Sequence, residues 1–148
     1  MNREEAMTAA PKRPSPVGVA AAVAAVTLTT MVLDLAFLGV LAKGLYDELL
    51  GPLRRPTVFW PAALGFYAMY VVALLVHAVL PSETAAAAAR RGAGLGLVAY
   101  ATYELTNWAV LAGWPAALVP LDIAWGVVLT ATAAATGNLA YRRFAQSS

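Results

Sequence analysis

The sequence predicts an all-α fold: a four-helix transmembrane bundle with a short interfacial helix between the first two spans. Hydrophobic residues make up 61% of the chain and charged residues only 12%, whereas a soluble chain has roughly 25% charged residues. Mean hydropathy is +0.69, and apolar stretches near the roughly 20 residues needed to cross a bilayer recur along the chain. Asp34, Glu104 and Asp122 interrupt or border these stretches. An ionised carboxylate at mid-bilayer costs roughly 2.5 to 3.5 kcal/mol, so these residues predict a buried acidic site.

The first span is predicted from Val17 to Ala42, after a polar, proline-rich tail at 1–16. A signal peptide is the competing interpretation, because basic residues precede an alanine-rich stretch. The apolar stretch is longer than the usual signal core of about 7 to 15 residues, and it contains Asp34. We therefore expect a membrane span.

Lys43 to Pro56 has apolar residues at the spacing of a short helix lying on the membrane surface. Thr57 to Leu80 is the second predicted span, with Pro61 tolerated in its first turn. Pro81 to Arg91 is expected to be a short polar connection.

Gly92 to Ala112 is the third predicted span, and Gly113-Trp114-Pro115 forms the turn into the fourth. The fourth span begins at Ala117 or at Pro120 and ends near Tyr141. The chain is thus expected to hold one membrane domain, 17–141, between cytoplasmic tails at 1–16 and 142–148.

Basic residues predict the orientation. One side holds Arg3, Lys12, Arg13, Arg90, Arg91, Arg142 and Arg143 and the other Lys43, Arg54 and Arg55, which is seven against three. The positive-inside rule then places both termini in the cytoplasm of a multi-pass protein.

The acidic residues are expected at similar depth. With a rise of about 1.5 Å per residue, Asp34, Glu104 and Asn107 lie about 3 to 7 Å outward of their helix centres, and Asp122 about 9 to 12 Å outward. Gly92, Gly96, Tyr100 and Glu104 share one face of the third span, which predicts that Glu104 points into the bundle.

These residues form the predicted site. Glu104 is assigned as the proton donor or acceptor and Asp34 as a neighbouring like charge within hydrogen-bonding or one-water reach. The residues expected to contact a ligand are Tyr100, Tyr103, Asn107, Asp122 and Trp125.

Structural roles compete with these assignments. Asp34 and Glu104 could merely join helices by accepting hydrogen bonds from Tyr100, Tyr103, Thr30 or Asn107, and Asp122 could be stabilised by the helix N-terminus after Pro120. Several other residues are predicted to have structural roles. Trp60, Trp108 and Trp114 are expected as interfacial anchors, His77 as an interfacial hydrogen-bonding residue, and the glycines at 92–96 as packing positions. The sequence indicates no metal site or nucleic-acid site, and it leaves any cofactor unknown.

Four segments carry a family resemblance: Leu33-Asp34, 66–70 (FYAMY), 100–107 (YATYELTN) and 121–126 (LDIAWG). From Thr30 to Tyr141 the chain resembles the bacterial membrane-protein family catalogued as domain of unknown function 2177. That family commonly has Asp at the position of Glu104 and Trp at that of Phe37. The resemblance implies a small bacterial inner-membrane protein and carries no established activity.

The function predicted is binding of a lipid-like or amphiphilic small molecule in an outward-facing acidic and aromatic pocket, with acid-base chemistry as an open question. Membrane lipids are the expected surroundings. Two alternatives stay open: a proton- or cation-coupled transporter with Asp34 and Glu104 in a relay, and an accessory subunit of a membrane complex or homo-oligomer.

Overall fold

A computed structural model describes residues 14–53 and 55–145, without the side chain of Pro52. Helix α2 (Pro16–Ala36) ends in a turn of π-helix (Phe37–Leu41), and α3 (Lys43–Leu50) ends in a 3₁₀ turn (Gly51–Leu53). Helix α4 (Trp60–Leu74) ends in a second π turn (Leu75–Val79), and α5 (Ala85–Val110) and α6 (Leu118–Ala145) follow. No strand occurs in the described ranges, so the all-α fold is confirmed.

Local sequence explains where α2 and α5 begin. The Ser15 hydroxyl accepts a hydrogen bond from the Gly18 amide, and Pro16 occupies the first helical position, where its missing amide hydrogen costs nothing. Thr84 caps α5 by accepting from the Ala87 amide at 3.1 Å. The prediction of a polar connection as far as Arg91 was therefore wrong, because the alanine run after Thr84 is a strong helix former.

Helix α6 begins at Leu118, between the two predicted starts, with Pro120 in its first turn. It continues past the predicted end at Tyr141 to Ala145, and the basic residues Arg142 and Arg143 occupy its last turn, where cations are favoured by the helix dipole. The tail predicted at 142–148 is thus helical up to Ala145, and 146–148 lie outside the described residues. Most of the tail predicted at 1–16 lies outside them as well.

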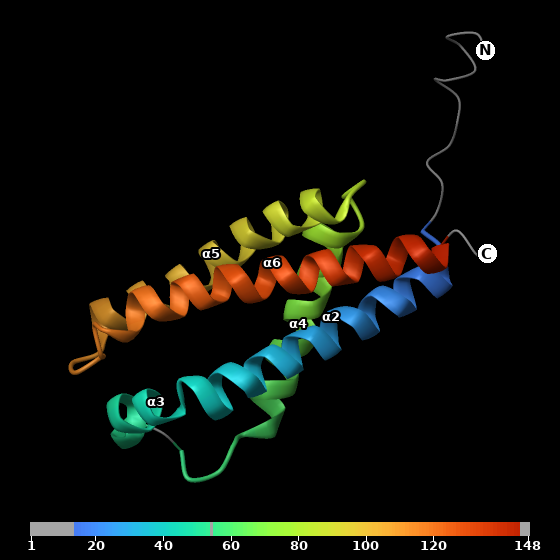
Figure 1. Ribbon diagram of the computed structural model, residues 1–148. Helices are drawn as coiled ribbons and strands as arrows, with labels where there is room; N and C mark the ends of the chain where they lie inside the picture. The colour runs from blue at the N-terminus through green and yellow to red at the C-terminus, as the bar shows by residue number, and fades with distance from the viewer. Residues whose placement is uncertain (1–13, 54, 146–148) are drawn as a thin grey trace, which may run out of the picture.

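Helices α2, α5 and α6 lie side by side, with α2 and α5 each antiparallel to α6 (Figure 1). Glycines bring the backbones close. A methyl group added at Gly96 would lie 2.3 Å from the Gly126 carbonyl oxygen, and one at Gly92 would lie 2.6 Å from the Thr130 carbonyl oxygen. The predicted small-residue face of α5 is therefore the face that packs on α6.

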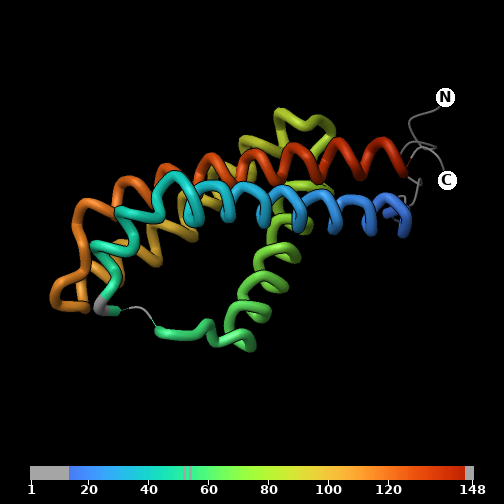
Figure 2. Tube along the Cα trace, turned by 60° about the horizontal axis from the view of Figure 1, so that its bottom comes forward, coloured from blue at the N-terminus to red at the C-terminus, as the bar shows by residue number. Residues whose placement is uncertain are grey.

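Helix α4 diverges from the other three helices in its first half. Figure 2 shows it leaving α2 and α6 at a steep angle. Tyr70, Leu74 and the following π turn pack into the core, whereas Trp60, Leu64 and Met69 are 65%, 64% and 67% exposed. The chain thus forms a three-helix layer with a fourth helix anchored by its C-terminal half, in place of a uniformly packed four-helix bundle.

Three helical segments in the described part of the chain are long and apolar enough to cross a membrane: Pro16–Leu41, Trp60–Val79 and Leu118–Ala145. Helix α5 is 26 residues long but more polar, because it carries Glu104, Asn107 and two arginines. Composition therefore supports three membrane spans, and a fourth rests on how α5 packs.

Candidate functional site

Asp34 lies where α2, α4 and α6 meet. Its carboxylate accepts a hydrogen bond from Trp125 Nε1 at 3.3 Å and one from the Tyr67 hydroxyl at 3.4 Å. The side chain is half-buried. Asp34 therefore joins three helices through two aromatic residues, and the predicted role of Trp125 in the site takes the form of a hydrogen bond to this acid.

Phe37 supports Trp125 from α2. The two rings are stacked with centroids 4.0 Å apart and planes at 8°. Phe37 is also the first residue of the π turn that ends α2, and its ring contacts Tyr46 of α3 edge-on at 6.4 Å. The face of Trp125 expected to stack against a ligand is thus covered by Phe37, one turn from Asp34.

A second polar contact joins Tyr70 of α4 to Thr130 of α6. The hydroxyls of Tyr70 and Thr130 are 2.5 Å apart and buried, and Thr130 also donates to the Gly126 carbonyl at 2.6 Å. The Tyr100 ring lies against Gly126, where an added methyl group would come within 2.1 Å of it. Glycine at 126 is therefore required for Tyr100 to occupy this position.

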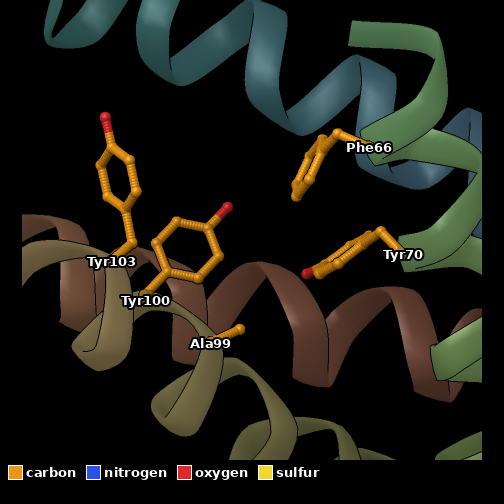
Figure 3. A pocket seen from close by; sticks show the side chains of 5 residues that line it. All are labelled: Phe66, Tyr70, Ala99, Tyr100 and Tyr103. Carbon is orange, nitrogen blue, oxygen red and sulfur yellow. The ribbon is translucent and has the colours of Figure 1, made fainter. Parts of the chain in front are cut away.

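A cavity of about 280 Å³ lies between α4 and α5. Its lining is almost entirely aromatic, with Phe66 and Tyr70 from α4 and Tyr100, Tyr103 and Ala99 from α5 (Figure 3). Two predicted ligand-contact residues, Tyr100 and Tyr103, thus line a cavity. Asp34 is not in its wall, but Tyr67, which donates to Asp34, meets the Phe66 ring of the wall edge-on at 5.4 Å.

Glu104 points into the bundle and is fully buried, as its spacing on the helix predicts. Its Oε2 accepts a hydrogen bond of 2.9 Å from Trp114 Nε1, and its Oε1 is buried without a partner. The Tyr103 ring meets the Trp114 ring edge-on at 5.7 Å. Trp114 therefore folds back from the interhelical turn over Glu104.

The two carboxylates expected to form a pair have different hydrogen-bond partners. Asp34 binds Trp125 and Tyr67, whereas Glu104 binds Trp114, and no direct hydrogen bond joins the two acids within the described residues. None of the partners expected for a purely structural role, such as Thr30 or Tyr100, donates to either acid. The donors are instead the indole N–H groups of Trp125 and Trp114, together with the Tyr67 hydroxyl.

Of the remaining predicted residues, Asp122 and His77 make none of these contacts within the described ranges, whereas Asn107 hydrogen-bonds the Tyr103 side chain. Asp122 is half-buried and is the fifth residue of α6, so it lies beyond the first turn, where a helix N-terminus stabilises an acid most. Asn107 is half-buried one turn beyond Tyr103, and His77 is exposed. Within the described ranges no cluster of three His, Asp or Glu side chains could hold a metal ion.

Tyr67 and Trp114 were missed by the sequence reasoning. No role in the site was predicted for Tyr67, because residue counting along single helices assumes that all helices run parallel. Trp114 was assigned to the interface, because tryptophan next to a turn commonly anchors there. One feature of the sequence could have predicted the role of Trp114. Buried indole N–H groups need hydrogen-bond acceptors, and intramembrane carboxylates are the strongest acceptors in this chain.

Comparison with known proteins gives one match. The family model described as "Predicted membrane protein (DUF2177)" covers residues 19–139, a range that includes every site residue described above. No curated protein matches the chain, and no solved structure does. Because the match extends over most of the sequence, the chain belongs to this predicted membrane protein family, DUF2177.

Proposed function

We propose that this membrane protein binds a small amphiphile in the aromatic cavity between α4 and α5, beside Asp34. The observation that carries the proposal is the cavity itself, with four aromatic side chains and one alanine in its wall. Small-molecule sites are concave, mostly apolar and aromatic, with a few polar groups that fix orientation. Tyr70, Tyr100 and Tyr103 supply hydroxyls here, and Asp34 supplies the nearby charge.

The divergence of α4 gives the cavity an entrance from the side. Phe66 and Tyr103 at its rim are 46% and 55% exposed. In a membrane that exposed surface is covered by lipid tails. An amphiphile can therefore enter from the bilayer without passing through the tightly packed α5 and α6 interface.

Asp34 has capacity for a ligand. Its two hydrogen bonds, at 3.3 and 3.4 Å, are longer than the usual 2.7 to 3.2 Å. A carboxylate has about four lone-pair sites, so a donor group on a ligand can add to or replace these bonds. Asp34 is therefore the polar anchor of the proposed site. The assignment of Glu104 as an acid or base stays a prediction, because Glu104 lies behind Trp114 and outside the cavity wall.

The proposal includes a bacterial inner-membrane location, a fourth span at α5 and cytoplasmic termini. Three observations support this topology. Helix α5 packs against α6 through Gly92 and Gly96, its 26 residues span about 39 Å, and seven of the ten basic residues fall on the side of the two termini. Helix α3, with Lys43 and Asp47 paired on its surface, suits a position at the outer interface.

Transport receives weaker support. Besides the contacts of Asp34, two polar pairs lie between helices: the hydroxyls of Tyr70 and Thr130, and those of Thr29 and Thr136 at 2.9 Å. Thr130 and Thr136 are separated by about 9 Å along α6, which is too far for a proton to pass without intervening groups.

An accessory or oligomeric role is supported by Gly94 of α5, which has open space around it, and such small residues permit helix association in membranes.

A cavity-filling substitution tests the proposal. Ala99→Phe places a ring in the cavity, whereas Val98→Phe adds the same ring on an exposed, lipid-facing position. We expect bacterial lipid extract to raise the unfolding temperature of the parent and of Val98→Phe in uncharged maltoside micelles, and to leave Ala99→Phe unchanged, because only a ligand of the native state stabilises it. A parent protein that the extract does not stabilise, or equal stabilisation of Ala99→Phe, would contradict the proposal.

A further inference from the structure

The cavity wall has the composition of a cation-binding cage. Phe66, Tyr70, Tyr100 and Tyr103 surround it, and the rings of Phe66 and Tyr70 lie 5.4 Å apart. The faces of aromatic rings carry partial negative charge and attract cations within about 6 Å, and cages of such rings are the usual sites for quaternary ammonium groups. Neutral apolar ligands need no such concentration of rings, since aliphatic residues would serve them as well.

The charge of Asp34 points to the same ligand class. Its hydrogen-bond donors, Trp125 and Tyr67, are both neutral, and no basic residue of the described chain forms an ion pair with it. Buried charges are normally paired, so an ionised Asp34 would lack a counter-ion among the described residues. Asp34 is joined to the cavity wall through Tyr67, whose hydroxyl donates to the carboxylate and whose ring meets the Phe66 ring edge-on at 5.4 Å.

The size of the cavity limits the part of the ligand that enters. About 280 Å³ is at the lower end of the roughly 300 to 1,000 Å³ typical of small-molecule sites. It holds a compact head group and leaves the alkyl chain to extend past Phe66 and Tyr103 into the lipid.

We propose that the cavity is an aromatic cage for the head group of an alkylammonium amphiphile, with Asp34 as its counter-charge. This inference rests on the proposed function and narrows its ligand to organic cations. Phe66 and Tyr103 close the cage on the lipid side, and Tyr70 and Tyr100 form its floor against α6. The positive head group compensates a carboxylate that no cation of the described residues pairs with.

The test compares a cation with a neutral amphiphile of the same chain length. Binding of decyltrimethylammonium and of decanol is measured by calorimetric titration of the full-length protein in uncharged maltoside micelles. We expect decyltrimethylammonium to bind the parent about tenfold more tightly than decanol. Asp34→Asn removes the charge and keeps an acceptor, and Phe66→Leu removes one ring face and keeps an apolar side chain. Each change should weaken cation binding about fivefold or more, and should weaken it more than it weakens decanol binding.

Met69→Leu is the matched control, because Met69 is exposed on α4 outside the cavity; it should bind both probes like the parent. Unfolding temperatures establish that each variant is folded. Equal affinity of the parent for both probes, or cation binding unaffected by both Asp34→Asn and Phe66→Leu, would overturn the cation inference while leaving amphiphile binding intact. If neither probe binds the parent and lipid extract also fails to stabilise it, the proposed function fails together with the inference.

Discussion

Trp114 Nε1 lies 2.9 Å from Glu104 Oε2 and donates a hydrogen bond to it. The donor lies in the turn between α5 and α6. The acceptor residue lies about 9 Å before the end of α5, measured along the helix axis. This contact ties the end of the helical hairpin to the buried face of α5. It also gives the acid its only hydrogen-bond partner within the described residues, since Oε1 has none.

Trp114→Phe should destabilise the protein by about 1 to 3 kcal/mol, because it leaves both oxygens of a buried carboxyl group without partners. The phenyl ring preserves the edge contact with Tyr103. Thermal unfolding in maltoside micelles measures the loss, with Trp108→Phe, at an exposed tryptophan of α5, as the control. In a Glu104→Leu background the cost should shrink, because the acceptor is absent. A cost independent of the residue at 104 would show that the hydrogen bond does not carry the effect.

Substitutions at Glu104 separate chemistry from helix packing. Glu104→Gln keeps a carbonyl oxygen for Trp114 and should unfold close to the parent temperature. Glu104→Leu leaves the indole N–H without an acceptor and should lower the free energy of unfolding by about 1 to 3 kcal/mol. If Glu104 also acts as an acid or base, the Gln variant loses stabilisation by lipid extract while remaining folded. A Gln variant that responds to extract like the parent would restrict Glu104 to a structural role.

Gly96→Ala should be among the most damaging small changes in the chain. The new methyl group would lie 2.3 Å from the Gly126 carbonyl oxygen, so α5 and α6 must separate. Overpacking of this kind costs about 1 to 3 kcal/mol. Gly94→Ala, which meets nothing within 4 Å, should be neutral or stabilising by up to about 1 kcal/mol through helix propensity. Equal unfolding temperatures for the two variants would contradict the close helix packing.

Cysteine labelling tests the orientation, since the chain has no native cysteine. Gly51→Cys at the end of α3 and Glu83→Cys in the loop before α5 are both exposed. In intact cells an impermeant thiol reagent should label only the cysteine at position 51, because the positive-inside rule places position 83 in the cytoplasm. Labelling at position 83 alone would invert the topology and place Asp34 in the cytoplasmic half of the membrane.

Periodicity predicted the parts of this structure that depend on one helix at a time. The spacing of Gly92, Gly96 and Glu104 predicted that they share the buried face of α5, and all three are buried. The pairing of Asp34 with Tyr67 could not be obtained in this way. Depth counted along a helix holds only if neighbouring helices run parallel, and α4 diverges.

The hydrogen-bond partner of Glu104, Trp114, could not be predicted for a different reason. Trp114 lies outside any helix, in a turn where Gly113 adopts a positive φ of 83°. A helical repeat says nothing about where such a side chain points. Its position depends on the backbone of three or four turn residues, and this left the usual interfacial role of tryptophan as the best available prediction.

The one-sided anchoring of α4 makes the cavity sensitive to bilayer thickness. The segment Trp60–Val79 has 20 residues and is about 30 Å long, close to the hydrocarbon thickness of a typical bilayer. Its second half packs into the core, whereas its first half is tied to α2 by the hydrogen bond from Tyr67 to Asp34. Hydrophobic mismatch therefore acts mainly on the half that carries Phe66 and Tyr67. A thinner bilayer is accommodated by greater tilt, which moves one wall of the cavity relative to α5. Lipid chain length would then regulate amphiphile affinity, and titrations in bilayers of 14-carbon and 18-carbon lipids would measure the effect.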